Sequence, residues 1–506
     1  MELLSPDRKD TVLKLLAELD MELDGRMLLR SNQTKFQDAA RTWIDFGDDH
    51  DEGSSSSSSR LPLVVIRVAS QKDVEKAVPI LVGLARDYDF PFRVQSGGHH
   101  KAGYSTVAGG AVLSLRKLKD IHFNKSQSMV TIGPGVRVEA FMEEMLAKRG
   151  YAGVVASAAR VAQGGFVLGG GFGALSRRYG LGIDNVQRLR IVLADGSVQN
   201  LQDGELFWAL RGGGSGSFGV VTEMDYKVYP TRDTKLALIA KVPMDHVGSF
   251  LHKLGRKEPY IPRELVAVFD RYEQEKEEEA LAVFQLTWMG DGPNSIAEGR
   301  HYLEQEIIPL FPQREHTHTT FFDFSWSKTS QESEQLPWAT SIRATQGWNG
   351  FLMPRNNTQF IWDNIQEQLS SLLKDCPHLS PNIELWGGAI SDVASNDTAF
   401  AYREAIYNVG VVLMVPNGTE DLKQVFQEQV NKVSQVWPLI AKYLSGAFVN
   451  YPMASLANRT YAPVYWGSNL KRLVEIKRKY DPINAFSYEQ SIPLHPKSMT
   501  AQLAQN

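Results

Sequence analysis

The chain has 506 residues and a mass of 56.5 kDa, with 43% hydrophobic and 22% charged residues. This composition is typical of a globular protein of roughly two or three domains, and it excludes disordered, collagen-like and disulfide-rich chains. The net charge of -4 and the pI near 6.3 favour neither nucleic acid nor anionic lipid as a partner, so a small-molecule substrate is expected.

Two features of the sequence bear on its location. There is no apolar run of the roughly 18 residues needed to span a bilayer, and the N-terminal twenty residues mix acids and bases, unlike a secretory signal. The single cysteine, Cys376, excludes an intrachain disulfide and fits a reducing compartment. An intracellular location is therefore favoured, but secretion stays open because six glycosylation triplets are present, at Asn32, Asn124, Asn356, Asn396, Asn417 and Asn458.

The first part of the chain alternates helical and strand patterns. Apolar residues recur at helical spacing over residues 8–29, and six serines at 54–59 predict an exposed loop. Helical patterns follow at 73–88 and 138–150. Between and around them lie β-rich runs at 61–68, 91–98, 109–115 and 128–135. This alternation predicts an α+β or α/β arrangement.

Glycine-rich segments indicate a ligand that approaches the backbone closely. Ser96-Gly97-Gly98 follows a β run, so its N–H groups can face a pyrophosphate, although a loop with surface histidines is the alternative. Further glycine clusters occupy 164–176 and 211–223, which suggests a ligand as long as a dinucleotide. The match of Gly169, Gly171 and Ala174 to G-x-G-x-x-A lies too deep in the domain to indicate a Rossmann fold.

The middle of the chain has a different pattern. Between about residues 226 and 445, strands such as 235–242, 265–272, 282–288 and 381–390 alternate with long polar helices. This predicts a separate domain in which helices back an antiparallel sheet. We therefore expect one domain at 1–225, a second at 226–445, and a return of 446–506 to the first.

At this point the motifs identify a family resemblance. The segment from about 60 to 225 resembles the flavin domain of the vanillyl-alcohol oxidase superfamily, with its PCMH-type FAD-binding domain, and in particular the berberine bridge enzyme-like branch. The motifs are SGGHxxxG at 96–103, GGGFGALSRRYGLGIDNV at 169–186, LADG at 193–196, DGELFWALRGGGSGSFGVVTE at 203–223, FVNY at 448–451 and KYDPINAFSYEQSIP at 479–493. The resemblance implies an α+β fold with a two-part FAD-binding domain and a substrate domain.

The resemblance also implies how FAD is held. His99 corresponds to the histidine that is bonded covalently to the flavin, and Ala158 stands where many relatives have a second, cysteine link. Cys376 lies in the other domain, so a single covalent bond through His99 is expected. The positions expected to bind the cofactor are Gln95, Ser96, Gly97, Gly98, His99, His100, Gly103, Ser157, Val161, Gly164, Gly165, Gly169, Gly173, Ala174, Val220 and Asn484.

On the substrate side, the resemblance assigns Asn450 and Tyr451 to the face of the flavin where substrate binds, with Tyr451 as the general base. A phenol has a pKa near 10, so it needs a cationic neighbour or a carboxylate that takes its proton. Glu384 is the candidate carboxylate, with Asp392 as the alternative. A solvated charge on an open sheet face is the other interpretation of Glu384.

Two further positions bear on substrate class. Trp386 lies two residues after Glu384, so both are expected on one face of a strand, where the indole could stack on a sugar ring. In the alkaloid-forming relatives a glutamate stands where this chain has Gly410, which weakens an alkaloid-type mechanism. Val161 occupies a position where valine is associated with oxidases in the family.

These inferences combine into one expected activity. We expect a FAD-dependent carbohydrate oxidase that takes hydride from C1 of a cellobiose-like sugar and gives a lactone and hydrogen peroxide, with oxygen as acceptor. An oxidase of a phenolic, alkaloid or terpenoid metabolite is the alternative, and a flavin-binding protein without turnover is a third interpretation. No metal site, nucleic acid or membrane partner is indicated.

Overall fold

The computed structural model describes residues 6–30, 33–40, 42, 61–276, 279–312, 317–332, 342–416, 419–456 and 460–495. The serine run at 54–59 and three of the glycosylation triplets, at Asn32, Asn417 and Asn458, lie outside these residues. Within the described part, none of the helices combines the length and the apolar character required to cross a bilayer.

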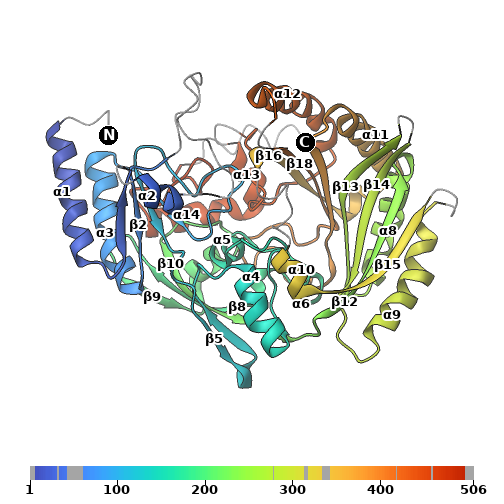
Figure 1. Ribbon diagram of the computed structural model, residues 1–506, viewed down its shortest axis with the longest axis horizontal. Helices are drawn as coiled ribbons and strands as arrows, with labels where there is room; N and C mark the ends of the chain where they lie inside the picture. Colours follow the sequence, from blue (N-terminus) through green and yellow to red (C-terminus); the bar gives the residue numbers. More distant parts are fainter. Residues whose placement is uncertain are drawn as a thin grey trace.

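The N-terminal half contains two larger sheets and the two-stranded β11-β7 pair, with helices packed around them (Figure 1). Its strands are β1 (Arg26–Leu29), β2 (Val64–Arg67), β3 (Phe92–Gln95), β4 (Ala111–Ser114), β5 (Ile121–Asn124), β6 (Met129–Ile132), β7 (Tyr151–Ala152), β8 (Val186–Val192), β9 (Val198–Leu201), β10 (Val220–Lys227) and β11 (Tyr229–Pro230). Its helices are α1 (Pro6–Glu22), α2 (Gln33–Ala40), α3 (Gln71–Tyr88), α4 (Val138–Phe141), α5 (Gln163–Leu168), α6 (Ser176–Tyr179) and α7 (Gly204–Leu210).

The first sheet has the strand order β1-β2-β4-β3. Strands β2, β4 and β3 are parallel, and their apolar residues are almost all buried, as expected for a sheet covered on both faces. The crossover helix α3 begins at Ser70, whose Oγ accepts a hydrogen bond from Asp73 N, while the Asp73 carboxylate accepts from Ser70 N. This sheet ends in the Ser96-Gly97-Gly98 turn that carries the candidate histidines.

One helix boundary differs from the sequence prediction. The N-terminal helix ends at Glu22 and does not continue to residue 29, because residues 26–29 form β1 and pair antiparallel with β2. Gly25 makes this turn possible, since a Cβ there would lie 2.0 Å from the Arg67 carbonyl oxygen.

The second sheet of this half is antiparallel, with the order β5-β6-β10-β8-β9. The glycine-rich segments lie beside it rather than after a first parallel strand, since residues 169–175 connect α5 to α6. The position of this segment therefore agrees with the absence of a Rossmann arrangement.

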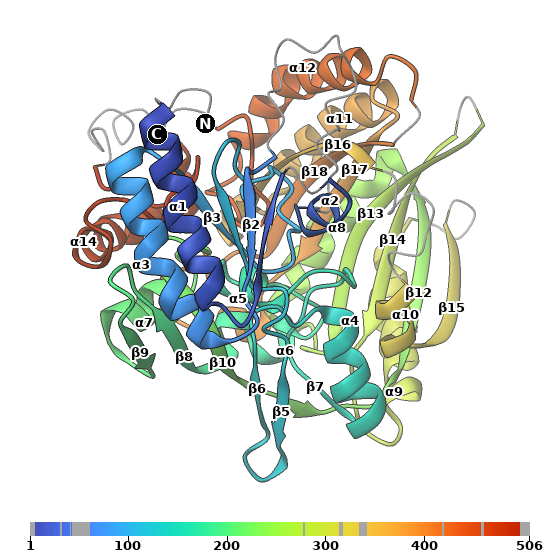
Figure 2. The same cartoon turned by 60° about the vertical axis from the view of Figure 1, so that its left-hand side comes forward.

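The middle part forms a seven-stranded antiparallel sheet with the order β15-β12-β14-β13-β17-β18-β16. Its strands are β12 (Thr234–Pro243), β13 (Leu265–Lys276), β14 (Glu279–Trp288), β15 (His318–Ser325), β16 (Ile342–Leu352), β17 (Leu379–Leu385) and β18 (Tyr407–Pro416). Its helices are α8 (Val247–Lys257), α9 (Ser295–Tyr302), α10 (Trp326–Glu332), α11 (Gln359–Asp375) and α12 (Leu422–Ala441). Figure 1 shows α8 on the side of this sheet away from the N-terminal half, and Figure 2 shows α11 and α12 beside each other near β16 and β18. The α+β fold with an antiparallel substrate-side sheet is thus confirmed.

The C-terminal segment packs against the N-terminal half. Helix α13 (Tyr461–Trp466) leads into α14 (Leu470–Tyr480), which contacts α7. Beyond α14, the Phe486 ring meets Phe92 of β3 edge to face at 5.5 Å between centroids, and it belongs to the same buried cluster as β2, β3 and β4. The two ends of the chain therefore build one core.

A buried ion pair fixes this return. The Lys477 ammonium lies 2.6 Å from Asp481 Oδ2, and neither side chain is exposed. Lys477 Nζ also donates to the carbonyl oxygens of Ser217 and Phe486, both at 2.7 Å, so all three of its protons are used. The pair therefore ties α14 to the glycine-rich loop at 211–219 and to the tail that carries Phe486.

We expect Lys477→Met to destabilise the protein strongly, because it leaves the Asp481 charge buried without its partner. The expected cost is about 3–5 kcal/mol. Thermal unfolding of the purified protein measures it, with Lys471→Met on the exposed face of the same helix as the matched control. Equal melting temperatures for the two variants would contradict the structural role of the pair.

Candidate active site

A cavity of about 760 Å³ lies between the N-terminal half and the inner face of the seven-stranded sheet. This size is in the range of small-molecule and cofactor sites. Three parts of the chain line it: the loops at 93–105, 156–172 and 214–221, the strands β17 and β18, and the C-terminal residues 448–451 and 486–488. The cavity therefore exists only where the two halves meet.

The Ser96–His100 loop forms one wall of the cavity. Gly98 has φ 77°, a conformation that glycine adopts without strain. Within the described part of the chain, the backbone N–H groups of Gly97 and Gly98 have no hydrogen-bond partner. N–H groups in such a turn suit the oxygens of a pyrophosphate. His99 is half-buried beside them and also lines the cavity.

Glycines keep other parts of the cavity wall open. A Cβ on Gly216 would meet no atom within 4 Å, and one on Gly165 would meet only Ser215 Oγ at 4.0 Å. Both residues line the cavity, so a side chain at either position would project into it. Together with the donor groups of the Ser96–His100 loop, this space fits an extended phosphate-bearing cofactor such as FAD.

Most of the predicted cofactor residues lie in this cavity. Those that line it are Ser96, Gly97, Gly98, His99, His100, Ser157, Val161, Gly164 and Gly165. Ala158 lines it too, whereas the single cysteine, Cys376, is buried at the end of α11 and does not line it.

The remaining predicted cofactor residues do not line the cavity. They are Gln95, Gly103, Gly169, Gly173, Ala174, Val220 and Asn484. Gln95 is fully buried and donates from Nε2 to the Ser105 carbonyl oxygen at 3.3 Å. Position 169 has no room for a side chain, since a Cβ on Gly169 would lie 1.9 Å from Asn450 Oδ1. The motif glycines thus include packing positions as well as cavity positions.

At the other end of the cavity, a tyrosine and a carboxylate meet. The Tyr451 hydroxyl donates to Glu384 Oε1 at 2.9 Å, although the two residues are 67 positions apart. Glu384 lies on β17 directly opposite Asn408 of β18, whose Nδ2 donates to Oε2 at 3.0 Å. Asn349 fixes the tyrosine backbone by donating to its carbonyl oxygen at 2.6 Å. Both carboxylate oxygens are therefore held, and the phenol has a fixed direction.

Burial shapes the protonation of this pair. It raises the pKa of Glu384, against the hydrogen bonds from Asn408 and Tyr451 and the nearby Lys101 charge, which lower it. Burial and the adjacent carboxylate hold the pKa of Tyr451 well above 10. The phenol therefore keeps its proton at neutral pH, and it can accept a substrate proton only by passing its own to Glu384.

The structure adds a cation that the sequence analysis did not single out. Lys101 lies two residues after His99 and lines the cavity, with its Nζ 5.1 Å from the centroid of the Tyr451 ring. Burial lowers the pKa of Lys101, and the Glu384 charge opposes this effect. The family motif reads x at this position, so only the folded geometry could identify it.

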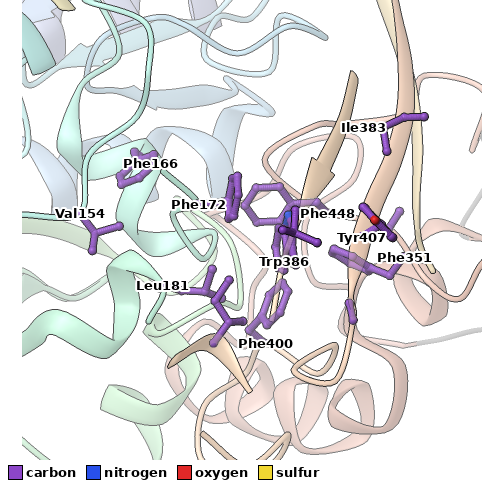
Figure 3. Close-up of a cluster of buried hydrophobic side chains, with 14 of the residues drawn as sticks. Val154, Phe166, Phe172, Leu181, Phe351, Ile383, Trp386, Phe400, Tyr407 and Phe448 are labelled. Atoms are coloured by element: carbon purple, nitrogen blue, oxygen red, sulfur yellow. The ribbon is translucent and has the colours of Figure 1, made fainter. Parts of the chain in front are cut away.

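Trp386 does not line the cavity, so the prediction that it contacts substrate is wrong. Its side chain is fully buried and stacks on Phe172 at 4.7 Å, among the aromatic rings shown in Figure 3. β17 ends at Leu385 and Gly387 has φ 82°, so Trp386 stands at the turn after the strand, with its indole near enough to Glu384 to help lower the pKa of that carboxyl group. The buried Arg177 donates to the Trp386 carbonyl oxygen and fixes this turn.

The two other predicted substrate residues have different outcomes. Asp392 is about half exposed and forms an ion pair with Arg263 at 2.7 Å, outside the cavity, so it is not an alternative to Glu384. Asn450 does line the cavity. Its Nδ2 donates to the Phe166 carbonyl oxygen at 2.8 Å, so the amide also joins the C-terminal segment to α5.

Comparisons with known proteins agree with this arrangement. Residues 62–202 match the family model described as FAD binding domain, and residues 447–493 match the one described as berberine and berberine like. The chain is 26% identical over 482 residues to the uncharacterized FAD-linked oxidoreductase YvdP of Bacillus subtilis (strain 168), which covers 93% of this chain and 98% of the relative. It is 26% identical over 457 residues to the monolignol oxidoreductase AtBBE-like 13 of Arabidopsis thaliana, covering 83% and 82%.

Solved structures show the same fold. A chitooligosaccharide oxidase superimposes with a TM-score of 0.79 at 20% identity, covering 96% of this chain and 100% of the other. Berberine bridge enzyme from Eschscholzia californica superimposes with a TM-score of 0.77 at 20% identity and the same coverage. The similarity therefore extends over both halves and the C-terminal return.

Proposed function

The chain belongs to the berberine bridge enzyme-like family of FAD-linked oxidoreductases, and from this premise we propose that it oxidises a reducing sugar at C1. The observation that carries the proposal is the buried Tyr451–Glu384 hydrogen bond at the sheet end of the cavity. Such a pair suits removal of a hydroxyl proton, since the phenol and the carboxylate together form a relay.

Two rows of side chains support a sugar as the substrate. Ser380, Asn382 and Glu384 alternate along β17, and all three line the cavity, so their polar groups can bind hydroxyls. On the neighbouring strand, Val412 and Met414 alternate in the same way and offer an apolar surface. A sugar ring has both hydroxyl edges and C–H faces, so it can use both rows. The similarity in fold to a chitooligosaccharide oxidase is consistent with this choice.

When bound, FAD would supply the acceptor for the hydride from C1, and its reoxidation by oxygen would give hydrogen peroxide. Tyr451 accepts the proton of the anomeric hydroxyl while its own proton passes to Glu384. The sugar becomes a lactone. His99 provides a single covalent link to the cofactor. Val161 lines the cavity, and valine at this position favours oxygen as the electron acceptor.

Anaerobic mixing of the purified holoprotein with glucose, cellobiose and lactose tests the proposal. We expect a disaccharide to bleach the yellow flavin absorbance, with the lactone as the product and peroxide formed once air is admitted. A monolignol alcohol is the comparison substrate, because the cavity also has an apolar row and a relative is a monolignol oxidoreductase. If this alcohol bleaches the flavin and none of the sugars does, the sugar proposal is refuted and the substrate is a phenolic alcohol.

A further inference from the structure

Lys101 is a charged residue in the cavity that the relay of Tyr451 and Glu384 does not itself use. Its ammonium faces the flat side of the Tyr451 ring, 5.1 Å from the centroid. A cation at this distance from an aromatic face is attracted by the ring. It also stabilises negative charge on the phenol oxygen or on a nearby carboxylate, since a buried site screens charges weakly.

Titratable groups from four parts of the chain surround this lysine. Tyr451, from the C-terminal segment, presents the face of its ring to the ammonium, and Glu384, on β17, lines the same cavity and is near enough for its charge to raise the pKa of Lys101. His99 and His100 lie on its own loop and line the same cavity. From β13, Arg271 lines the sheet side, where it pairs at 2.8 Å with Glu273, a carboxylate that Lys241 also contacts at 2.6 Å. Among these groups, the Glu384 carboxylate is the anion whose charge acts on Lys101.

We propose that Lys101 is a positioning residue for proton transfer, whose charge keeps Glu384 an anion that can take the proton of Tyr451. The inference rests on the proposed function for the reaction it serves. Before the step, Glu384 is negative and Lys101 positive. The substrate proton then bonds to the Tyr451 oxygen as the Tyr451 O–H bond breaks toward Glu384. The carboxyl group ends neutral, and Lys101 stays charged.

The pH dependence of flavin reduction tests this role. Lys101→Met removes the charge at similar length, so the pKa of Glu384, already raised by burial, rises further. Because the relay needs the carboxylate, the rate falls by at least about tenfold at pH 7 and recovers as the pH increases. Lys101→Arg restores the wild-type profile, and Lys253→Met, on the exposed face of α8, leaves it unchanged.

An effect on structure alone would behave differently. It would lower the rate of Lys101→Met equally at every pH, and it would not be rescued by arginine. Either result overturns the proposal. Flavin content and melting temperature, measured on the same samples, verify that the variants are folded holoprotein.

A second measurement needs no substrate and separates this inference from the choice of sugar. Reductive methylation with formaldehyde labels neutral amines, and mass spectrometry reads the extent at Lys101 and at Lys253 in one sample. Since the Glu384 charge raises the pKa of Lys101, Glu384→Gln makes Lys101 react several-fold faster at a fixed pH while Lys253 keeps its rate. Unchanged labelling of Lys101 overturns the proposal. Faster labelling without bleaching by any sugar supports it and refutes only the sugar.

Discussion

Replacing Tyr451 with phenylalanine is expected to slow anaerobic flavin reduction by about 10²–10⁴-fold, the usual contribution of a general base. The variant keeps the ring that packs edge to face on Phe448 and loses only the hydroxyl that donates to Glu384. Stopped-flow absorbance with the best reducing substrate measures the rate. Tyr260→Phe, at a tyrosine that is 86% exposed, is the matched control and should react like the wild type.

A double variant sharpens this prediction. Because Tyr451 accepts a proton only by passing its own to Glu384, Glu384→Gln should cost a similar factor, and the pair of substitutions should cost little more than either one. If the two losses multiply instead, the residues act independently and no relay connects them. The activity should fall as the pH decreases through the raised pKa of Glu384, since the protonated carboxyl group cannot accept the proton of Tyr451.

Replacing His99 with alanine is expected to abolish covalent flavin attachment completely. After denaturation in acid, the wild type should retain its yellow colour and one FAD-sized mass increment, whereas His99→Ala should release all of its flavin. No other bond is expected, because Ala158 has no nucleophile and the buried Cys376 does not line the cavity. Mass spectrometry of the intact denatured chain measures the outcome.

The neighbouring histidine supplies the control for this experiment. His100 also lines the cavity, and its Nδ1 accepts from the backbone N–H of Ala102 at 3.3 Å, so its ring is turned toward its own loop. His100→Ala should therefore keep the covalent flavin. A mass increment that persists in His99→Ala and disappears in His100→Ala would show that the covalent link is made by His100 and would contradict the prediction.

The sequence predicted the fold well because each layer has a strong local pattern. The runs at 61–68, 91–98, 109–115 and 128–135 became β2, β3, β4 and β6, and helix α3 covers the predicted 73–88. The failure near residue 29 has a local cause, since the pairing of β1 with β2 overrides the helical spacing. Tertiary contacts of this kind leave no signal in periodicity.

The site was predicted less completely, for two physical reasons. A sequence motif includes residues whose type is restricted by packing as well as residues that contact a ligand. Gly169 and Gly173 are of the first kind, since neighbouring atoms leave no room for a side chain and neither residue lines the cavity. Strand spacing also does not tell which side chains are covered by others: Trp386 is buried beneath Phe172 and Phe448, whereas Glu384 meets Tyr451. Lys101 and Asn408 join the site through contacts across the fold, which no spacing along the chain describes.

The return of the C-terminal segment has a consequence for the order of events during protein synthesis. Residues 448–451 and 486–488 form one wall of the cavity, and Phe486 completes the core beneath β3, although β3 itself is made some 390 residues earlier. During synthesis the cavity therefore stays open until residue 488 has left the ribosome, although the motifs at 96–103 and 169–186 are already complete. We expect a truncated product that ends before residue 448 to bind no flavin and to stay colourless, so colour distinguishes such fragments from chains that contain the returning segment.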